Sequence, residues 1–212
     1  MLSRMKLFRA ISIPLMLCGS IVGVCITTTS CTGGDGDNNC IPVEWLDIDQ
    51  NGVLNGLNTT GFAGNFSNYE TLKIPQNVKT IKSDAFNQNV NPCAGFNSYI
   101  QLIDIPDNSL LTTLGSSCFA SCANLAGIEL PISFTTFGTS CFANCPNFCM
   151  LEIDSNSVVP FASNMLDNTS YKTNQQQNQG IVMVNTAAIA NQYRSASGWN
   201  AYPNDCFIGL DQ

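Results

Sequence analysis

The residues best suited to hold a metal ion lie in the stretch DIDQNGVLNG, residues 47–56. Four of them match the opening of a calcium-binding loop, D-x-[DN]-x-[DN]-G: Asp47, Asp49, Asn51 and Gly52. Such a loop needs a bidentate glutamate at its twelfth position and a helix on either side. The twelfth position here is Asn58, and the flanking residues alternate as in strands. Because Asn and Gly both tolerate positive φ, the pair Asn51-Gly52 favours a turn between two strands over a calcium site.

Cysteine is the second residue type that could carry chemistry, as a thiol, a disulfide or a zinc ligand. Three of the 11 cysteines lie at or before Cys31, which leaves eight: Cys40, Cys93, Cys118, Cys122, Cys141, Cys145, Cys149 and Cys206. Burial as reduced thiols is the preferred interpretation for those that recur in a repeat, because a free cysteine behaves as a small hydrophobe. Disulfides between repeats are an alternative in an exported protein, although their geometry is demanding. A zinc site is a further alternative, since Cys145-x3-Cys149 has plausible spacing, but the chain has neither histidine nor a C-x2-C pair.

The composition excludes several classes of function. The chain has 212 residues, 8 Lys plus Arg and a formal net charge of −7, and so has too few basic groups to neutralise nucleic-acid phosphates. It has no histidine, which removes the Ser-His and Cys-His arrangements of nucleophilic enzymes. No glycine-rich phosphate loop and no nucleophile with a base partner is found. We therefore expect no catalytic residues, no cofactor, no metal and no nucleic-acid partner.

An internal repeat positions the cysteines. LGSSCFASCANL (residues 114–125) and FGTSCFANCPNF (137–148) share their glycine, phenylalanine and both cysteines at one constant offset, the step from Gly115 to Gly138. A third copy, IKSDAFNQN (81–89), precedes an insertion, VNPCAGFNSY (90–99). The residues expected in the core of the repeats are Phe86, Phe119, Phe142, Cys118, Cys141, Cys122 and Cys145. A unit of this length cannot bury its apolar face alone, so the copies are expected to stack as a solenoid.

Short alternating runs mark the strands of each copy. A first run ends at or near a proline in LKIP (72–75), IDIP (103–106) and IELP (128–131), and recurs as LEI (151–153). A second run follows in VKTI (78–81), LTTL (111–114) and FTTF (134–137). Alternation of apolar and polar residues indicates strands with one buried face. We predict a mainly β solenoid with parallel strands and about three to four short repeats.

One polar residue of each first run occupies the same position: Lys73, Asp104, Glu129 and Glu152. Because side chains alternate across a strand, these four are expected to point outward from one face, about 4.8 Å apart. Adjacent carboxylates repel, so the preferred interpretation is that they keep an exposed sheet soluble and discourage edge pairing. The alternative is a binding stripe for a basic partner or a divalent cation.

The N-terminus has the features of an export signal. Arg4, Lys6 and Arg9 precede an uncharged, mainly apolar run over residues 10–26, and the run is followed by TTTSC. This resembles a bacterial lipoprotein signal in which Cys31 becomes lipidated, giving a signal peptide at 1–31 and a small polar tether at 32–40. An uncleaved anchor, or a signal peptide cleaved nearby, is the alternative. The remaining chain is expected to be exported and lipid-anchored at the cell surface, or else secreted.

The repeat I-x-[IL]-P-x-x-[VF]-x-x-[IF]-[GK]-x-x-[AC]-F-x-x-C-x-x-L resembles the BspA-type leucine-rich repeats, and IELPISFTTFGTSCFANCPNF (128–148) matches it at nearly every position. LDIDQNGVLNGLNTTGFAGN (46–65) looks like the family's N-terminal hairpin, and GIVMVNTAAIANQYRSASGWNAY (180–202) like its C-terminal cap, with Asn185 where proline is usual. The resemblance implies an N-terminal cap hairpin at 41–71, repeats at 72–153 and a strand-helix cap at 154–212. Trp199 and Tyr202 are expected to seal the open end of the solenoid.

What the resemblance implies about function is recognition, not catalysis. Members of the family are typically surface-exposed or secreted proteins, often associated with adhesion. The expected partner is a protein or glycan on another cell or in extracellular matrix, with contact to the membrane only through the lipid anchor and an oligomeric state left open. A structural surface lipoprotein without a dedicated ligand and a calcium-binding exported protein are the alternatives.

Overall fold

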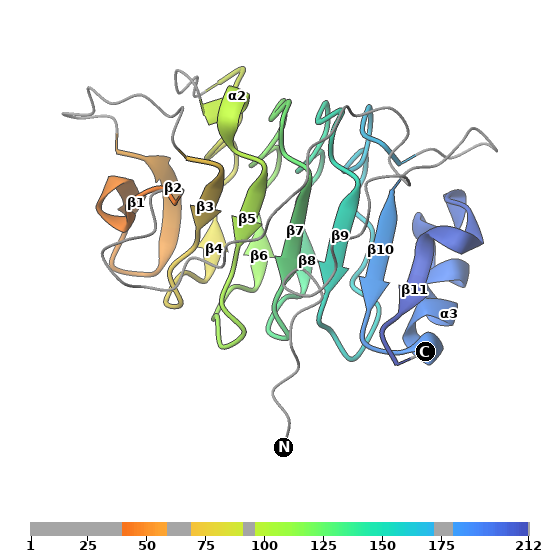
Figure 1. Cartoon of the computed structure of the whole chain (residues 1–212). Coiled ribbons are helices and arrows are strands. Elements are labelled where there is room, and N and C mark those ends of the chain that lie inside the picture. Colours follow the sequence, from red (N-terminus) through yellow and green to blue (C-terminus); the bar gives the residue numbers. More distant parts are fainter. Residues whose placement is uncertain (1–39, 59–68, 91–95, 172–179, 212) are drawn as a thin grey trace.

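The computed structural model describes residues 40–58, 69–90, 96–171 and 180–211. Its strands form two sheets that run along one solenoid (Figure 1). The larger sheet has six strands: β3 (Thr71–Lys73), β5 (Leu102–Asp104), β7 (Gly127–Leu130), β9 (Met150–Ile153), β10 (Ile181–Val184) and β11 (Phe207–Gly209). The smaller has five: β1 (Leu46–Ile48), β2 (Val53–Leu57), β4 (Thr80–Ile81), β6 (Thr113–Leu114) and β8 (Thr136–Phe137).

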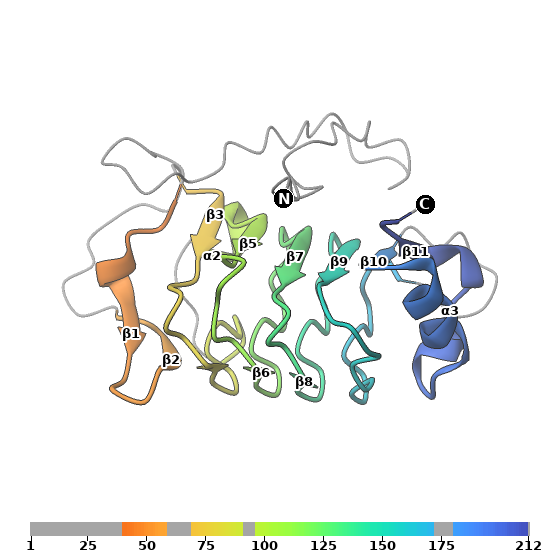
Figure 2. The same cartoon turned by 90° about the horizontal axis from the view of Figure 1, so that it is seen from below.

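The predicted leucine-rich-repeat solenoid is confirmed. Each turn contributes one strand to the larger sheet and, through most of the chain, one to the smaller, and the two rows of strands lie on opposite sides of the molecule (Figure 2). Among the described residues, every pair of neighbouring strands is parallel except β1 with β2. Parallel neighbours follow from the repeat, because each copy passes through the same path and lies directly over the copy before it.

The core lies between the two sheets. From the larger sheet it receives a row of buried residues, in register from turn to turn: Leu72, Ile103, Ile128, Leu151, Val182 and Phe207. The smaller sheet contributes Leu54, Ile81, Leu114 and Phe137 in the same way. Because side chains alternate across a strand, these inward-pointing residues define the buried face of each sheet.

The third side of each turn is irregular backbone, and a ladder of hydrogen bonds joins it to the neighbouring turns. Phe86 N, Phe119 N and Phe142 N donate to the carbonyls of Cys118, Cys141 and Met165 at 2.8, 2.9 and 3.1 Å. The chain bends here at residues in the left-handed region, with φ between 54° and 63°. They are Asp84, Ser117, Ser121, Ser140 and Asn144, followed in the last copy by Asn164 and Asn168. Asp, Asn and Ser suit such bends, because their short polar side chains bond to nearby backbone.

A fourth copy continues this side beyond the strand at 151–153. Asn164 and Asn168 take the positive φ of Ser140 and Asn144 in the copy before, and Ser140 N donates to Ser163 O at 2.9 Å. The buried positions of that copy hold Met165, Leu166 and Thr169. Sequence comparison detected only its strand, because a methionine, a leucine and a threonine stand where the other copies have cysteine, phenylalanine and cysteine.

Both ends of the solenoid are capped. At the start, β1 and β2 form the predicted hairpin, and η1 (Val43–Trp45) precedes it. At the end, α3 (Ala187–Ser195), η3 (Trp199–Ala201) and η4 (Asn204–Cys206) cover the last turn. The strand β11 was not predicted. Arg194 of α3 attaches it to the helix by donating from Nη2 to Phe207 O at 2.7 Å and from Nε to Asn204 O at 2.9 Å.

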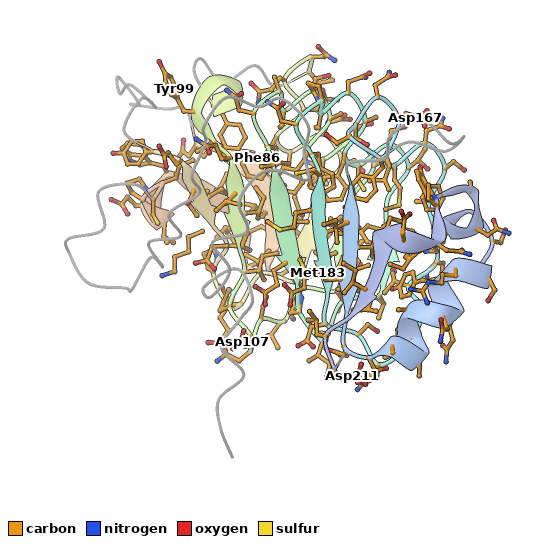
Figure 3. The ribbon with its side chains drawn as sticks, turned by 45° about the vertical axis from the view of Figure 1, so that its right-hand side comes forward. Phe86, Tyr99, Asp107, Asp167, Met183 and Asp211 are labelled. Atoms are coloured by element: carbon orange, nitrogen blue, oxygen red, sulfur yellow. The ribbon has the colours of Figure 1, made fainter. Side chains whose placement is uncertain are left out.

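The insertion after the first copy forms the short helix α2 (Phe96–Tyr99). Phe96 is buried and stacks on Phe86, with ring centroids 5.2 Å apart. Figure 3 shows Phe86 directed into the interior and Tyr99 directed outward. No helix among the described residues is both long and apolar enough to cross a membrane.

Candidate binding face

The predicted polar stripe exists as one row across the larger sheet. Lys73 is opposite Asp104, and Glu129 is opposite Glu152. The register of β5 with β7 places Asp104 next to Glu129. The row continues on the same face through Met183, opposite Glu152, and Ile208 of β11.

The expectation that all four polar residues face solvent is wrong for Glu152. Lys73, Asp104 and Glu129 are half-buried, whereas Glu152 is only 6% exposed. Glu152 is flanked in the row by two long side chains, Glu129 and Met183, and Met183 is itself buried. The accessible charged part of the row therefore consists of one cation and two carboxylates.

A second row runs beside the first, two residues earlier on each strand. Its members are Thr71, Leu102, Gly127, Met150 and Ile181. Apolar Leu102, Met150 and Ile181 are half-buried, and Gly127 interrupts them with no side chain. The sequence analysis singled out only the charged positions. The signal for this second row was present in the same runs, at the residues two positions before them.

The repeat cysteines are free thiols in the core. Cys118, Cys122, Cys141 and Cys145 are between 0% and 2% exposed. Burial raises the pKa of the Cys118 and Cys141 thiols well above the usual range. A thiol with a raised pKa is a poor nucleophile and a poor metal ligand. No group of three or more potential ligands within the described ranges could hold a metal ion.

The second cysteine of each copy also makes a polar contact. Cys122 Sγ donates to Phe86 O at 3.4 Å, and Cys145 Sγ donates to Phe119 O at 3.0 Å. Each thiol therefore bonds to the phenylalanine carbonyl of the preceding turn. The rings of those phenylalanines stack in the core, with centroids 5.2 Å apart for Phe86–Phe119 and 6.0 Å for Phe119–Phe142.

The calcium-like stretch is the turn of the hairpin. The Asp49 carboxylate accepts the N–H groups of Asn51 at 2.8 Å and Val53 at 2.9 Å. These bonds, chiefly the one from Val53, lower the pKa of Asp49. Gly52 takes a φ of 81°, and a Cβ there would lie 2.6 Å from Asn77 O. The aspartate that suggested a cation site thus organises a turn with its own backbone.

The aromatic residues near the C-terminus seal the solenoid. Trp199 and Tyr193 are fully buried. Trp199 Nε1 donates to Val159 O at 2.8 Å, and the Tyr193 hydroxyl accepts the Val159 N–H at 2.9 Å. Tyr202 is also buried, and its ring lies against those of Phe161 and Tyr171, with centroids 5.9 and 6.2 Å away. The polar groups of Trp199 and Tyr193 thus bond to the backbone of Val159 in the last turn, as an end cap requires.

Several predicted features lie outside the described residues: the signal segment, Cys31 and Cys93. Cys40, at the start of the described part, is disulfide-bonded. The proposed division of the chain at residues 31, 40, 71 and 153 stays a prediction.

Comparisons with known proteins place the repeat in context. The sequence model of the BspA type leucine rich repeat region, in six copies, matches residues 38–93 and 57–194. A search of curated proteins gave no match. Among solved structures, the chain is similar to the pneumococcal vaccine antigen PcpA, with 17% sequence identity and a TM-score of 0.40. The similarity covers 77% of this chain and 46% of that one, so this chain spans less than half the length of PcpA.

Proposed function

Since this chain belongs to the family of BspA-type leucine-rich repeat proteins, we propose that it is a recognition module that mediates adhesion or protein–protein interaction. Its partner would be a protein or glycan on another cell or in extracellular matrix. The module would act at the cell surface, attached through a lipid on Cys31 and the tether at 32–40, or after secretion.

The observation that carries the proposal is the charged row on the larger sheet. Lys73, Asp104 and Glu129 project from three neighbouring strands, with Leu102 of the second row beside them. Ladder hydrogen bonds fix the strands, so binding a partner costs little ordering of the face itself. Half-buried charges next to apolar side chains provide both orientation and contact area, as at protein interfaces.

The test is binding of the purified full chain to extracellular-matrix and cell-surface preparations. We expect saturable binding that weakens about tenfold in the double variant Asp104→Asn, Glu129→Gln, because charged contacts of this kind contribute on the order of 1 kcal/mol or more. The matched control is Glu44→Gln with Asp205→Asn, which removes the same two charges from exposed positions in the two caps.

The results separate two functions. Weaker binding in the double variant with unchanged binding in the control supports recognition through this face. Equal binding of both variants would reject the face, and absence of saturable binding in all three proteins would favour a structural surface protein without a dedicated ligand.

A further inference from the structure

The outer face of the smaller sheet differs in charge from the charged row on the larger sheet. Three segments form it, residues 76–83, 110–116 and 133–139, which contain β4, β6 and β8 and have no acidic residue. The larger sheet, with its row of carboxylates, lies on the opposite side of the solenoid (Figure 2). The net charge of −7 is therefore not spread evenly over the molecule.

Two lysines lie at the first turn of this face. Lys79 and Lys82 are both exposed, and they directly precede and follow the two residues of β4. Because Ile81 is buried, alternation directs Lys82 outward together with Thr80. On the next two turns the face carries uncharged threonines instead. We call the whole set the hydroxyl face: Lys79, Thr80, Lys82, Thr112, Thr113, Thr135 and Thr136.

Hydrogen bonds within the hydroxyl face fix the direction of its threonine protons. Thr112 Oγ1 lies 3.1 Å from Lys79 O and 3.2 Å from Thr113 Oγ1. A carbonyl can only accept, so Thr112 donates its single proton to it, and Thr113 must donate the bond between the two hydroxyls. Thr136, Thr135 and the Thr112 carbonyl repeat this arrangement one turn later, with both distances 3.2 Å. Thr113 and Thr136 therefore have committed protons and offer only oxygen lone pairs to a ligand.

The strand ladder holds these acceptors in a regular row. Thr80 is opposite Thr113, and Thr113 is opposite Thr136. Neighbouring strands are about 4.8 Å apart, which is similar to the advance per ring of an extended polysaccharide. Two apolar side chains, Leu110 and Ile132, are 49% and 55% exposed and precede β6 and β8 in the chain. The surface thus offers two cations at one end, a row of acceptors beyond them, and apolar groups that suit the C–H faces of sugar rings.

We propose that the hydroxyl face is a second binding site, separate from the charged row, and that it binds an acidic polysaccharide composed of uronic-acid and neutral sugar rings. Lys79 and Lys82 bind the carboxylate of one ring, and hydroxyls of the following rings donate to Thr113 and Thr136. Two lysines are too few for a phosphate-dense polymer such as nucleic acid. A heavily sulfated chain has fewer hydroxyl donors to match the threonine oxygens. The carboxylates of the larger sheet lie across the core, at least about 10 Å away, where salt screens much of their repulsion.

The test is direct binding of the full chain to hyaluronan oligosaccharides, with heparin and neutral dextran as comparison ligands. We expect saturable binding of hyaluronan that weakens as the salt concentration rises. Lys79→Gln with Lys82→Gln should weaken it about fivefold, because two charged contacts are lost, and Lys79→Arg with Lys82→Arg should restore it. Thr113→Val with Thr136→Val keeps the strand propensity but removes the acceptors, and should weaken binding about threefold. Urea unfolding checks that each variant is folded.

Four results would overturn the proposal. The first is the absence of saturable hyaluronan binding by the wild type at low salt. The second is equal binding by the wild type and either the glutamine or the valine variant. The third is equal binding of dextran and hyaluronan, which would mean that the lysines select nothing. The fourth is binding of heparin without binding of hyaluronan, which would mean that the face attracts sulfate groups and does not recognise uronic acids.

Discussion

Replacing Gly138 with alanine tests how closely adjacent turns approach. Gly138 follows β8 and lies against Gly115, the corresponding residue after β6. A Cβ on Gly138 would lie 2.3 Å from the carbonyl carbon of Gly115 and 2.4 Å from Ser116 N. Real Cβ atoms essentially never lie within 3.0 Å of a heavy atom outside their own residue and its chain neighbours, so the turns would have to separate.

The loss of stability in Gly138→Ala depends on which atoms have to move. The obstructing atoms belong to backbone that is held by bonds from Gly115 N to Ile81 O at 2.8 Å and from Ser117 N to Thr139 O at 2.9 Å. Overpacking costs about 1–3 kcal/mol when side chains can adjust. Since only backbone can adjust here, we expect the upper end, about 3 kcal/mol. With a urea m-value of about 2 kcal/mol per molar, the unfolding midpoint should fall by about 1.5 M.

Urea unfolding followed by circular dichroism measures this fall in the unfolding midpoint, with Thr139→Ala as the matched control. The Thr139 side chain is exposed, and its carbonyl keeps its ladder bond in the variant. The control should remain within about 0.5 kcal/mol of the wild type. If Gly138→Ala unfolds at the same midpoint as Thr139→Ala with an unchanged m-value, close approach of the turns is not why glycine occupies this position.

Three further outcomes are expected. Phe119→Ala, which empties a fully buried position in the ring stack, should cost about 3–5 kcal/mol in urea unfolding. Gly52→Val should lower the melting temperature, because Gly52 has positive φ and no space for a Cβ, while added calcium should leave the wild-type melting temperature unchanged. Asp49 has a lowered pKa, so its stabilising effect is present above its unfolded pKa, near 3.8, and is lost as pH falls through the folded value. The difference in urea midpoint between wild type and Asp49→Ala should therefore shrink below that pH.

The repeat shows why some elements were predictable and others were not. The copies that hold Phe119 and Phe142 share glycine, phenylalanine and two cysteines, so their constant offset was visible in the letters alone. The fourth copy keeps the path of the backbone but replaces those side chains with others that fill a similar volume, such as Leu166. Core volume can be filled by several residue types, so a repeat can persist in space after its sequence signal has faded.

The caps and the candidate binding face illustrate a different limit. The pair Asn51-Gly52 predicted the hairpin, because the preferences of turn residues are local. The strand β11, in contrast, is held by Arg194, which lies 13 residues earlier in a helix and donates to Phe207 O. Likewise, alternation placed Glu152 on the same face as Glu129, but it could not show that Glu152 is buried while Glu129 is only half-buried. Exposure is a property of the assembled sheet and not of the strand.

The sequence by itself determined the class of fold, the parallel stacking of the repeats and the shared core position of their phenylalanines, because each follows from residue type and spacing. The lack of histidine also excluded a histidine-based mechanism. Tertiary structure alone decided two things: which residues of the charged row are accessible, and which end elements close the solenoid. The physical reason is the same in each case. Periodicity fixes the direction in which a side chain points, whereas its burial depends on what the neighbouring turns place beside it.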